Sequence, residues 1–269
     1  MKSSWTPDVH RHINLKPMPY RKQQFVNYEI YHIIVRALDD NLIFKNTDDY
    51  YRGIFSIYEF NTSESVTIQR RREERAYFKK ISENLVPTLI RGHRVSTDSE
   101  PADLRDKFLD VVSFCFMPNH IHLLLRQLKE NGISKFMQKV GVGYGKYFNG
   151  KYERKGHVFQ DTFKAVHIKD DNQFKTVVPY IFTNPTALIE PGWKELGIRN
   201  HSTEEVVKFL KEYKWSSYQD CIGIKNFPSV TERKFLLEIM GGEQGLNGAV
   251  GNWITRKKDI GQFSDLFLE

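Results

Sequence analysis

Two short apolar runs separated by a turn constrain the fold of this chain more than any other feature. Residues 110–116 (DVVSFCF) and 120–126 (HIHLLLR) are each long enough for one buried strand and too short for a typical helix. Met117, Pro118 and Asn119 lie between them and supply turn-forming chemistry. We therefore expect the two runs to pair as an antiparallel hairpin.

Further strands and helices are expected on both sides of this hairpin. β-branched and aromatic residues favour strands, whereas apolar residues at helical spacing, preceded by a capping residue, favour helices. The expected strands are 28–37, 110–116, 120–126 and 157–168. One expected helix is capped by Thr47 or Asp48, a second covers 133–148, and a third is capped by Asp170 or Asp171 and ends at Asn184, which precedes Pro185. The first six elements predict an α+β fold with a ferredoxin-like split βαββαβ antiparallel sheet, and a further helix follows it.

The expected elements divide the chain into three parts. Residues 1–26 read as an irregular basic leader, 27–190 as the domain with the candidate site, and 191–269 as a helical C-terminal extension. Within the domain, the highly charged residues 61–108 predict an inserted, partly mobile arm. The extension is expected to hold helices near 203–213 and 231–240, an aromatic cluster at 215–218, and a loosely packed, glycine-rich tail from Gly241.

Charge and cysteine content narrow the class of partner and the compartment. The 269 residues carry a formal net charge of +7, which favours a polyanionic partner such as nucleic acid. Cys115 and Cys221 are too few for a disulfide framework or a Cys-rich zinc site. The N-terminal residues lack an apolar signal segment, and no apolar run approaches the roughly 20 residues that cross a bilayer. We therefore expect a cytoplasmic protein without a membrane partner.

His120 and His122 form the first half of a candidate site. Because side chains alternate along a strand, both imidazoles project from one face and can clamp a metal. Tyr180 and Asn184 stand four residues apart in the last expected helix, so a phenol and an amide share one helix face. If this helix lies against the histidines, it supplies a third ligand and a nucleophile. Structural histidines, a packed tyrosine and an ordinary helix end fit the same residues.

Basic residues interleaved with aromatic ones follow the helix expected at 133–148. Such a combination suits phosphate contacts and base stacking on single-stranded or hairpin nucleic acid, although a solvated loop fits equally well. The basic residues in question are Lys146, Arg154, Lys155 and Lys164. Arg36, in the first expected strand, can also contact phosphate, whereas His32 in the same strand reads more simply as a core histidine.

Five segments, in order, resemble a known family of transposases. They are residues 31–36 (YHIIVR), 117–125 (MPNHIHLLL), 159–164 (FQDTFK), 180–185 (YIFTNP) and 215–218 (WSSY). The second resembles the HUH motif, and the fourth the Tyr-Ile-x-x-Asn-Pro helix, of the tyrosine transposases associated with repetitive extragenic palindromes (RAYTs) and their insertion-sequence relatives. The ordered set, spanning about residues 25–220, is more specific than any single match.

The resemblance implies a metal-dependent transposase that nicks and joins DNA with one tyrosine. It assigns His120, His122 and Asn184 to a divalent metal, Mg²⁺ or Mn²⁺, and makes Tyr180 the nucleophile on a catalytic helix. Attack on single-stranded or hairpin DNA would give a 5′-phosphotyrosine link and a free 3′-hydroxyl. Two imidazoles make a softer site than Mg²⁺ prefers, which favours Mn²⁺ in vitro. The resemblance also implies a nucleoid-associated protein acting as a monomer or homodimer.

Two features depart from the family pattern. Pro179 precedes Tyr180, and a proline inside a helix costs about 3 kcal/mol, so we expect a kink or a fresh helical turn there. Glycines at 141, 143 and 145 weaken the expected helix; they fail the spacing of a phosphate-binding loop, and a close packing approach explains them more simply. Two other functions stay open: a metal-dependent hydrolase built on the histidine pair, and a catalytically inactive nucleic-acid-binding module.

Overall fold

The computed structural model describes residues 24–66, 105–160 and 162–255, so most of the expected leader and of the expected arm lies outside the described residues. The strands are β1 (Ile30–Arg36), β2 (Leu109–Met117), β3 (His120–Gln127) and β4 (Lys164–Ile168). The helices are α1 (Thr47–Glu59), α3 (Gly132–Lys151), α4 (Asp171–Thr183), α5 (Trp193–Leu196), α6 (Thr203–Glu212), α7 (Tyr218–Cys221), α8 (Arg233–Met240) and α9 (Gly242–Thr255), with 3-10 turns η1 (Leu38–Asp40) and η2 (Asn184–Leu188). Within this part of the chain, no helix combines the length and apolar character needed to cross a membrane.

The four strands form one sheet in the order β2-β3-β1-β4. Every neighbouring pair is antiparallel, so β3 separates the parallel strands β1 and β2, as in a split βαβ unit. This topology confirms the predicted ferredoxin-like fold and the predicted β2–β3 hairpin. Ile34 of β1 lies opposite His122 of β3, and Arg36 lies opposite His120. The histidine pair therefore lies on one of the two central strands.

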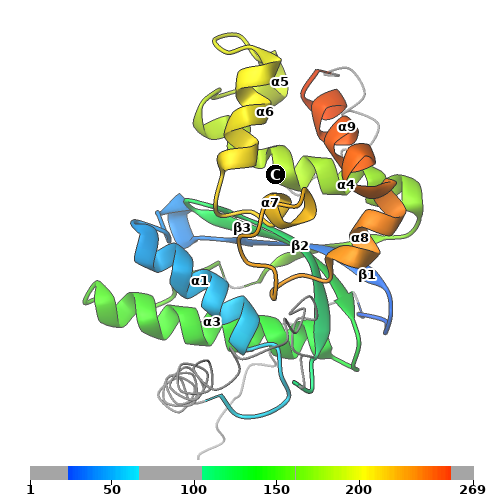
Figure 1. Ribbon diagram of the computed structural model, residues 1–269. Helices are drawn as coiled ribbons and strands as arrows, with labels where there is room; N and C mark the ends of the chain where they lie inside the picture. The colour runs from blue at the N-terminus through cyan, green and yellow to red at the C-terminus, as the bar shows by residue number, and fades with distance from the viewer. Residues whose placement is uncertain (1–23, 67–104, 161, 256–269) are drawn as a thin grey trace, which may run out of the picture.

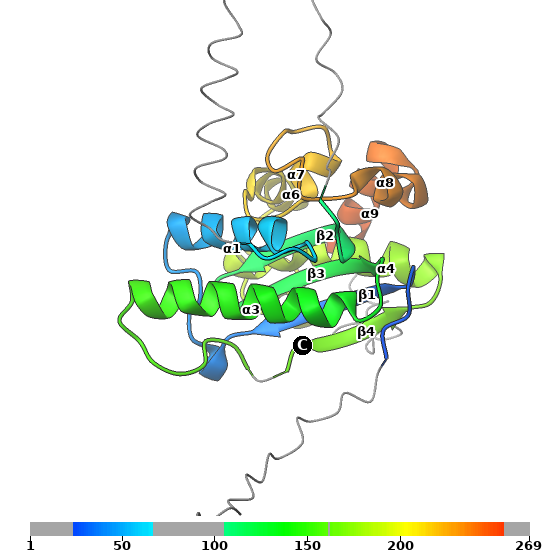
Figure 2. The ribbon, with the colours of Figure 1, turned by 90° about the horizontal axis from the view of Figure 1, so that it is seen from below.

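The sheet is the middle of three layers (Figure 1). The two crossover helices, α1 and α3, cover one face, and Figure 2 shows α4 behind the sheet on the other face. Helices α8 and α9 pack against α4 and extend this second helical layer. The segment that follows β4 thus returns across the face that the crossover helices leave uncovered.

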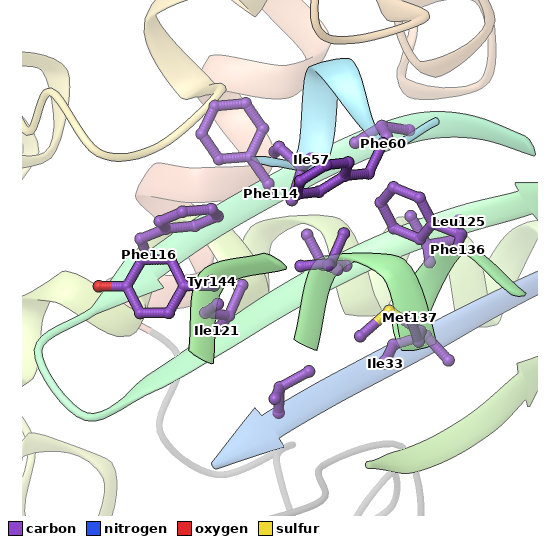
Figure 3. Close-up of a cluster of buried hydrophobic side chains, with 14 of the residues drawn as sticks. Ile33, Ile57, Phe60, Phe114, Phe116, Ile121, Leu125, Phe136, Met137 and Tyr144 are labelled. Carbon is purple, nitrogen blue, oxygen red and sulfur yellow. The ribbon is translucent and has the colours of Figure 1, made fainter. Parts of the chain in front are cut away.

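The face under α1 and α3 is apolar and rich in aromatic rings. Figure 3 shows Phe114, Phe116, Phe136 and Tyr144 in this cluster, between the sheet and the two helices. Gly143 allows the helices to come close, because a Cβ there would lie only 2.2 Å from the ring of Phe60. This glycine therefore serves packing within a continuous helix and not a phosphate-binding loop.

Two predicted boundaries are wrong. The strand expected over 157–168 is regular only from Lys164, and Phe159 before it forms an isolated bridge with Ala37, the residue after β1. The cap of α1 is Asn46, not Thr47 or Asp48. The Asn46 side chain accepts a hydrogen bond from the Asp49 backbone N–H, and the Asp49 side chain accepts from the Asn46 N–H. This capping box satisfies two donors that the helix itself cannot pair.

The prediction of a loosely packed tail from Gly241 is also wrong as far as Thr255. Residues Leu246, Val250 and Ile254 of α9 are buried. They recur every four positions and so form one helix face, which packs in the cluster around α4. Frequent glycines masked this period in the sequence.

The described ends of the predicted arm, 61–66 and 105–108, are anchored to the core. The Asn61 side chain donates a hydrogen bond to the Leu109 carbonyl at 2.8 Å and accepts one from the Phe108 N–H at 3.2 Å. Both Asn61 and Phe108 are buried. The arm therefore leaves and rejoins the domain beside the first residue of β2.

Candidate active site

The face of the sheet under α4 carries buried histidines. Strand alternation sends Ile33 and Leu123 into the α1–α3 core, and sends His32 and His122 to the opposite face. His32 and His122 are fully buried, whereas His120, at the start of β3, is partly exposed. The rings of His120 and His122 lie 4.9 Å apart between centroids. The backbone register thus brings the predicted pair together at one end of the sheet.

Each of the two histidines proposed as metal ligands has its Nδ1 atom hydrogen-bonded. His120 Nδ1 lies 2.7 Å from Asn119 Oδ1, and His122 Nδ1 lies 3.1 Å from His32 Nε2. A histidine that donates through Nδ1–H carries its basic lone pair on Nε2, the nitrogen that a metal would bind. In this tautomer His32 accepts from His122 and orients it. His32 therefore belongs to the site, although the sequence favoured an ordinary core histidine.

Helix α4 places Tyr180 against these histidines. The Tyr180 ring lies edge-to-face with His122 at 5.7 Å and with His32 at 5.8 Å between centroids. The side chain is 3% exposed. Helix α4 runs continuously through Pro179, so no separate helix begins there. Packing of α4 in the buried apolar cluster on this face of the sheet offsets the loss of the hydrogen bond that the proline cannot make.

Asn184 follows α4, one turn after Tyr180, and is buried. Its Nδ2 donates to the Tyr180 carbonyl oxygen at 3.0 Å, which fixes the direction of the amide. Its Oδ1 accepts a hydrogen bond from Lys194 Nζ at 2.8 Å. The same ammonium lies 4.8 Å from the centre of the Tyr180 ring. Lys194, in α5, joins the site through the tertiary fold, and no motif or periodicity marks it in the sequence.

A pocket of about 410 Å³ opens beside these residues. Its charged lining residues are the cations Arg36 and Lys194 and the carboxylate Glu195, and its polar ones include Asn119, His120 and Asn184. Such a combination of cations and hydrogen-bonding groups suits a phosphate group. Arg36, a predicted DNA contact, thus lies beside the candidate metal ligands.

Of two other predicted DNA contacts, Lys164 lies on the site's side of the sheet and Lys155 lies in the loop after α3. Lys164 pairs with Ile34 in the β1–β4 register, so its exposed side chain projects from the α4 face. Lys155 is exposed in the loop that joins α3 to β4. Gln160 of this loop donates its N–H to the Arg36 carbonyl at 3.0 Å, which holds the loop at the end of β1 nearest His120.

The remaining two predicted contacts lie elsewhere. Lys146 is exposed on α3, and Arg154 lies just beyond that helix with its guanidinium 5.5 Å from the centre of the Phe148 ring. Helix α3 covers the face opposite α4 (Figure 2). The predicted basic set is therefore divided between the two sides of the sheet.

The donor set fits a divalent metal. In the part of the chain that the structure describes, no three His, Cys, Asp or Glu side chains gather at one point. The candidate donors are two imidazoles and an amide. Hydrogen bonds at Nδ1 hold both imidazoles in orientation. The Asn184 oxygen accepts a hydrogen bond from the Lys194 ammonium, so its lone pairs face a cation in this structure. His120 and Asn184 line the same pocket.

Other buried tyrosines have structural roles. Tyr144 and Tyr213 each donate a hydroxyl hydrogen bond to a backbone carbonyl, and Tyr218 donates to a side-chain amide. Burial raises the pKa of all three hydroxyls, that of Tyr218 to about 12. These phenols are held as neutral donors, whereas Tyr180 packs against two histidines and a lysine.

Comparison with known proteins identifies the segment that carries this site. Residues 103–184 match the family model described as "Transposase IS200 like", and this range includes His120, His122, Tyr180 and Asn184. No curated protein matches the chain. One solved structure is described as "Structure of the REP associates tyrosine transposase bound to a REP hairpin". It is similar over 78% of this chain and 90% of that chain, with 13% sequence identity and a TM-score of 0.40. Residues 103–184 of this chain are therefore similar to the IS200-like transposases.

Proposed function

We propose that this protein is a transposase that cleaves and rejoins single-stranded or hairpin DNA, with Tyr180 as the nucleophile and a divalent metal held by His120, His122 and Asn184. The single observation that carries the proposal is the packing of Tyr180 against His122, at 5.7 Å between ring centroids. His122 lies in β3 and Tyr180 lies in α4, and these elements are far apart in the sequence. Their meeting in one buried cluster supports the chemistry that the family resemblance implies.

The proposed step exchanges one phosphate ester for another. Tyr180 Oη forms a bond to phosphorus while the bond from phosphorus to the 3′-oxygen of the DNA breaks. The phenol loses one proton and the leaving 3′-oxygen gains one, so the products are a 5′-phosphotyrosine and a free 3′-hydroxyl. Because an ester bond is conserved, a 3′-hydroxyl can reverse the step and join strands without an external energy source.

The protein's own residues hold the reacting groups in place. Burial of Tyr180 and its contacts with His32 and His122 restrict the ring to one orientation, which lowers the entropic cost of reaching the reactive geometry. Arg36 and Lys194 line the adjacent pocket and suit the phosphate oxygens that gain charge. A bound metal would supply Lewis-acid stabilisation of the same phosphate. Manganese suits the two imidazoles better than magnesium.

The two competing functions have less support. A hydrolase would need further acidic or histidine ligands, and the described residues contain no group of three such side chains. A purely binding module would be expected if Pro179 kept Tyr180 away from the histidines. Helix α4 continues through Pro179 and brings Tyr180 to the histidines. Neither alternative gives Tyr180 a role.

A covalent-adduct assay tests the proposal. Labelled single-stranded hairpin oligonucleotides are incubated with the full-length protein and Mn²⁺ and resolved on a denaturing gel. We expect a protein–DNA band that is absent with chelator and absent for Tyr180→Phe, because phenylalanine lacks the attacking oxygen. Tyr51→Phe is the matched control: Tyr51 is 42% exposed and lies outside the cluster, so this variant should form the band.

The possible failures are distinct. A band that persists in Tyr180→Phe would move the chemistry to another tyrosine. DNA binding without a band, across hairpins of varied stem and loop sequence, would favour the binding module. Phosphodiester hydrolysis without a band that survives Tyr180→Phe would favour the hydrolase.

A further inference from the structure

Lys194 places a positive charge at the position where the proposed site needs a metal ligand. It lies in α5, a four-residue helix that follows a left-handed glycine, Gly192, with φ 76°. The neighbouring Trp193 is 3% exposed and anchors this short helix in the protein. The Lys194 side chain is only partly exposed and reaches the pocket shared with His120 and Asn184. Its position is therefore set by the fold and not by a free surface chain.

The contacts of Lys194 are specific. Its Nζ donates to Asn184 Oδ1 at 2.8 Å, while the other end of that amide donates to the Tyr180 carbonyl at 3.0 Å. The amide cannot rotate to aim its oxygen in another direction without losing the second bond. Its oxygen must therefore serve either the ammonium or a metal in this orientation.

Two cations cannot share this oxygen at low cost. A metal binds an oxygen ligand at about 2.0–2.2 Å, which would put it within roughly 5 Å of an ammonium on the same atom. Like charges at this separation repel, and the repulsion is stronger beside buried groups than in water. Metal binding to Asn184 thus requires the ammonium to move away from the amide.

We propose that Lys194 is an internal cation that competes with the divalent metal for Asn184 and so lowers the metal affinity of the resting protein. This inference rests on the proposed function, because it takes His120, His122 and Asn184 as the metal site. Lys194 acts through Asn184 and is a positioning residue in this role. Its ammonium lies 4.8 Å from the centre of the Tyr180 ring and its side chain lines the pocket, so a short displacement from the amide keeps the charge near the nucleophile.

The test measures metal binding without DNA or catalysis. Mn²⁺ is titrated into the full-length protein, and the free Mn²⁺ is followed by its electron paramagnetic resonance signal. We expect Lys194→Met to lower the Mn²⁺ dissociation constant about 10-fold, because it removes the competing charge. Lys175→Met is the matched control: Lys175 is exposed on α4, and its loss should change the constant less than about twofold. An unchanged constant in Lys194→Met overturns the inference.

Repeating the Lys194→Met comparison in the Asn184→Ala variant tests whether the change in Mn²⁺ affinity acts through the amide. In Asn184→Ala, competition for Oδ1 is gone, so adding Lys194→Met should leave the Mn²⁺ affinity nearly unchanged. An equal gain in both backgrounds would mean general charge repulsion and would overturn competition at Asn184. Circular dichroism checks the fold of Asn184→Ala, which alters a buried position. The single Lys194→Met comparison stays decisive on whether the lysine opposes the metal.

His120→Ala separates this inference from the proposed function. If Mn²⁺ binding does not depend on His120, the proposed metal site is wrong. If binding depends on His120 but not on Lys194, only the competition is wrong. A protein that binds no Mn²⁺ in either the wild type or Lys194→Met contradicts both.

Discussion

The two faces of the sheet are built from the same strands but differ in chemistry. In β1 and β3, Ile33 and Leu123 point to the α1–α3 face, while His32 and His122 point to the α4 face. Both sets are almost fully buried. The first face packs apolar and aromatic side chains (Figure 3), whereas the second buries imidazoles, a phenol and an amide at the end nearest the pocket.

This contrast indicates that one face of the sheet mainly stabilises the fold and the other mainly carries the function. Burying polar groups costs free energy unless each finds a partner, and apolar side chains of similar size avoid that cost. The α4 face accepts polar groups where the candidate site lies and is apolar elsewhere, around residues such as Leu124 and Val178. We therefore expect the α1–α3 face to dominate the free energy of unfolding and the α4 face to dominate metal binding and DNA cleavage.

The largest expected effect is on stability. Phe136, fully buried in α3, belongs to the α1–α3 core (Figure 3). Phe136→Ala should lower the free energy of unfolding by about 3–5 kcal/mol, because it removes apolar contacts and leaves a cavity. Urea denaturation followed by circular dichroism measures this change. At a temperature where the variant is folded, its Mn²⁺ affinity should equal that of the wild type, and a large loss would contradict the division between the faces.

The next effect is on metal binding. His32→Leu removes the acceptor for His122 Nδ1 and should weaken Mn²⁺ binding about 10- to 100-fold, as loss of an orienting hydrogen bond does at other metal sites. Titration calorimetry of DNA-free protein measures it. His32→Gln offers an amide oxygen as acceptor and should recover part of the affinity.

Stability again distinguishes the faces in this case. His32→Leu should lower the free energy of unfolding by less than Phe136→Ala does, because it replaces a polar group by an apolar one. If the two variants lost equal stability while His32→Leu bound Mn²⁺ normally, His32 would be a core residue without a role in the site.

The smallest effect concerns the polar anchor of the α1–α3 face. Asp49, at the start of α1, accepts hydrogen bonds from Lys151 at 2.8 Å and from Tyr152 at 2.6 Å. Burial alone would raise the pKa of Asp49, but these bonds and others hold it below its ordinary value of 3.8. Asp49→Asn should cost about 1.5 kcal/mol at pH 7, a figure reduced because Lys151 is partly exposed.

The pH dependence of this effect has a definite sign. Because the carboxyl has a lower pKa in the folded state, its contribution to stability is complete above about pH 4 and decreases as the pH falls through the folded value. The gap between wild type and Asp49→Asn in denaturation experiments should therefore narrow below pH 4. A gap that widened on acidification would contradict the ion-pair role of Asp49.

Local sequence signals predicted most of the fold. The apolar runs on either side of Pro118 predicted the hairpin, and the order of elements predicted the sheet topology. The start of β4 and the helix α9 were the clear errors. Residues 157–163 have strand composition, but composition does not reveal that Phe159 forms an isolated bridge there and that the regular strand begins at Lys164. In α9, glycines interrupt the composition of a helix whose stability comes from tertiary packing.

The candidate site was predicted only where spacing carries the signal. His120 and His122 share a strand face, and Tyr180 and Asn184 share a helix face, because those periods are local. Lys194 and the bond between His32 and His122 depend on the tertiary fold, since their partners lie 10 and 90 residues away. The predicted basic cluster does not stay together in the fold, because Lys146 lies on α3 whereas Lys164 lies on β4.

The most direct test of the account is the identity of the residue that links protein to DNA. Protein incubated with hairpin oligonucleotide and Mn²⁺ is digested with protease and nuclease, and the modified peptide is sequenced by mass spectrometry. We expect a nucleotide remnant on Tyr180, the phenol packed against His32 and His122. A remnant on Tyr147 or Tyr152, beside the basic residues of α3, would place the chemistry on the other side of the sheet and contradict it.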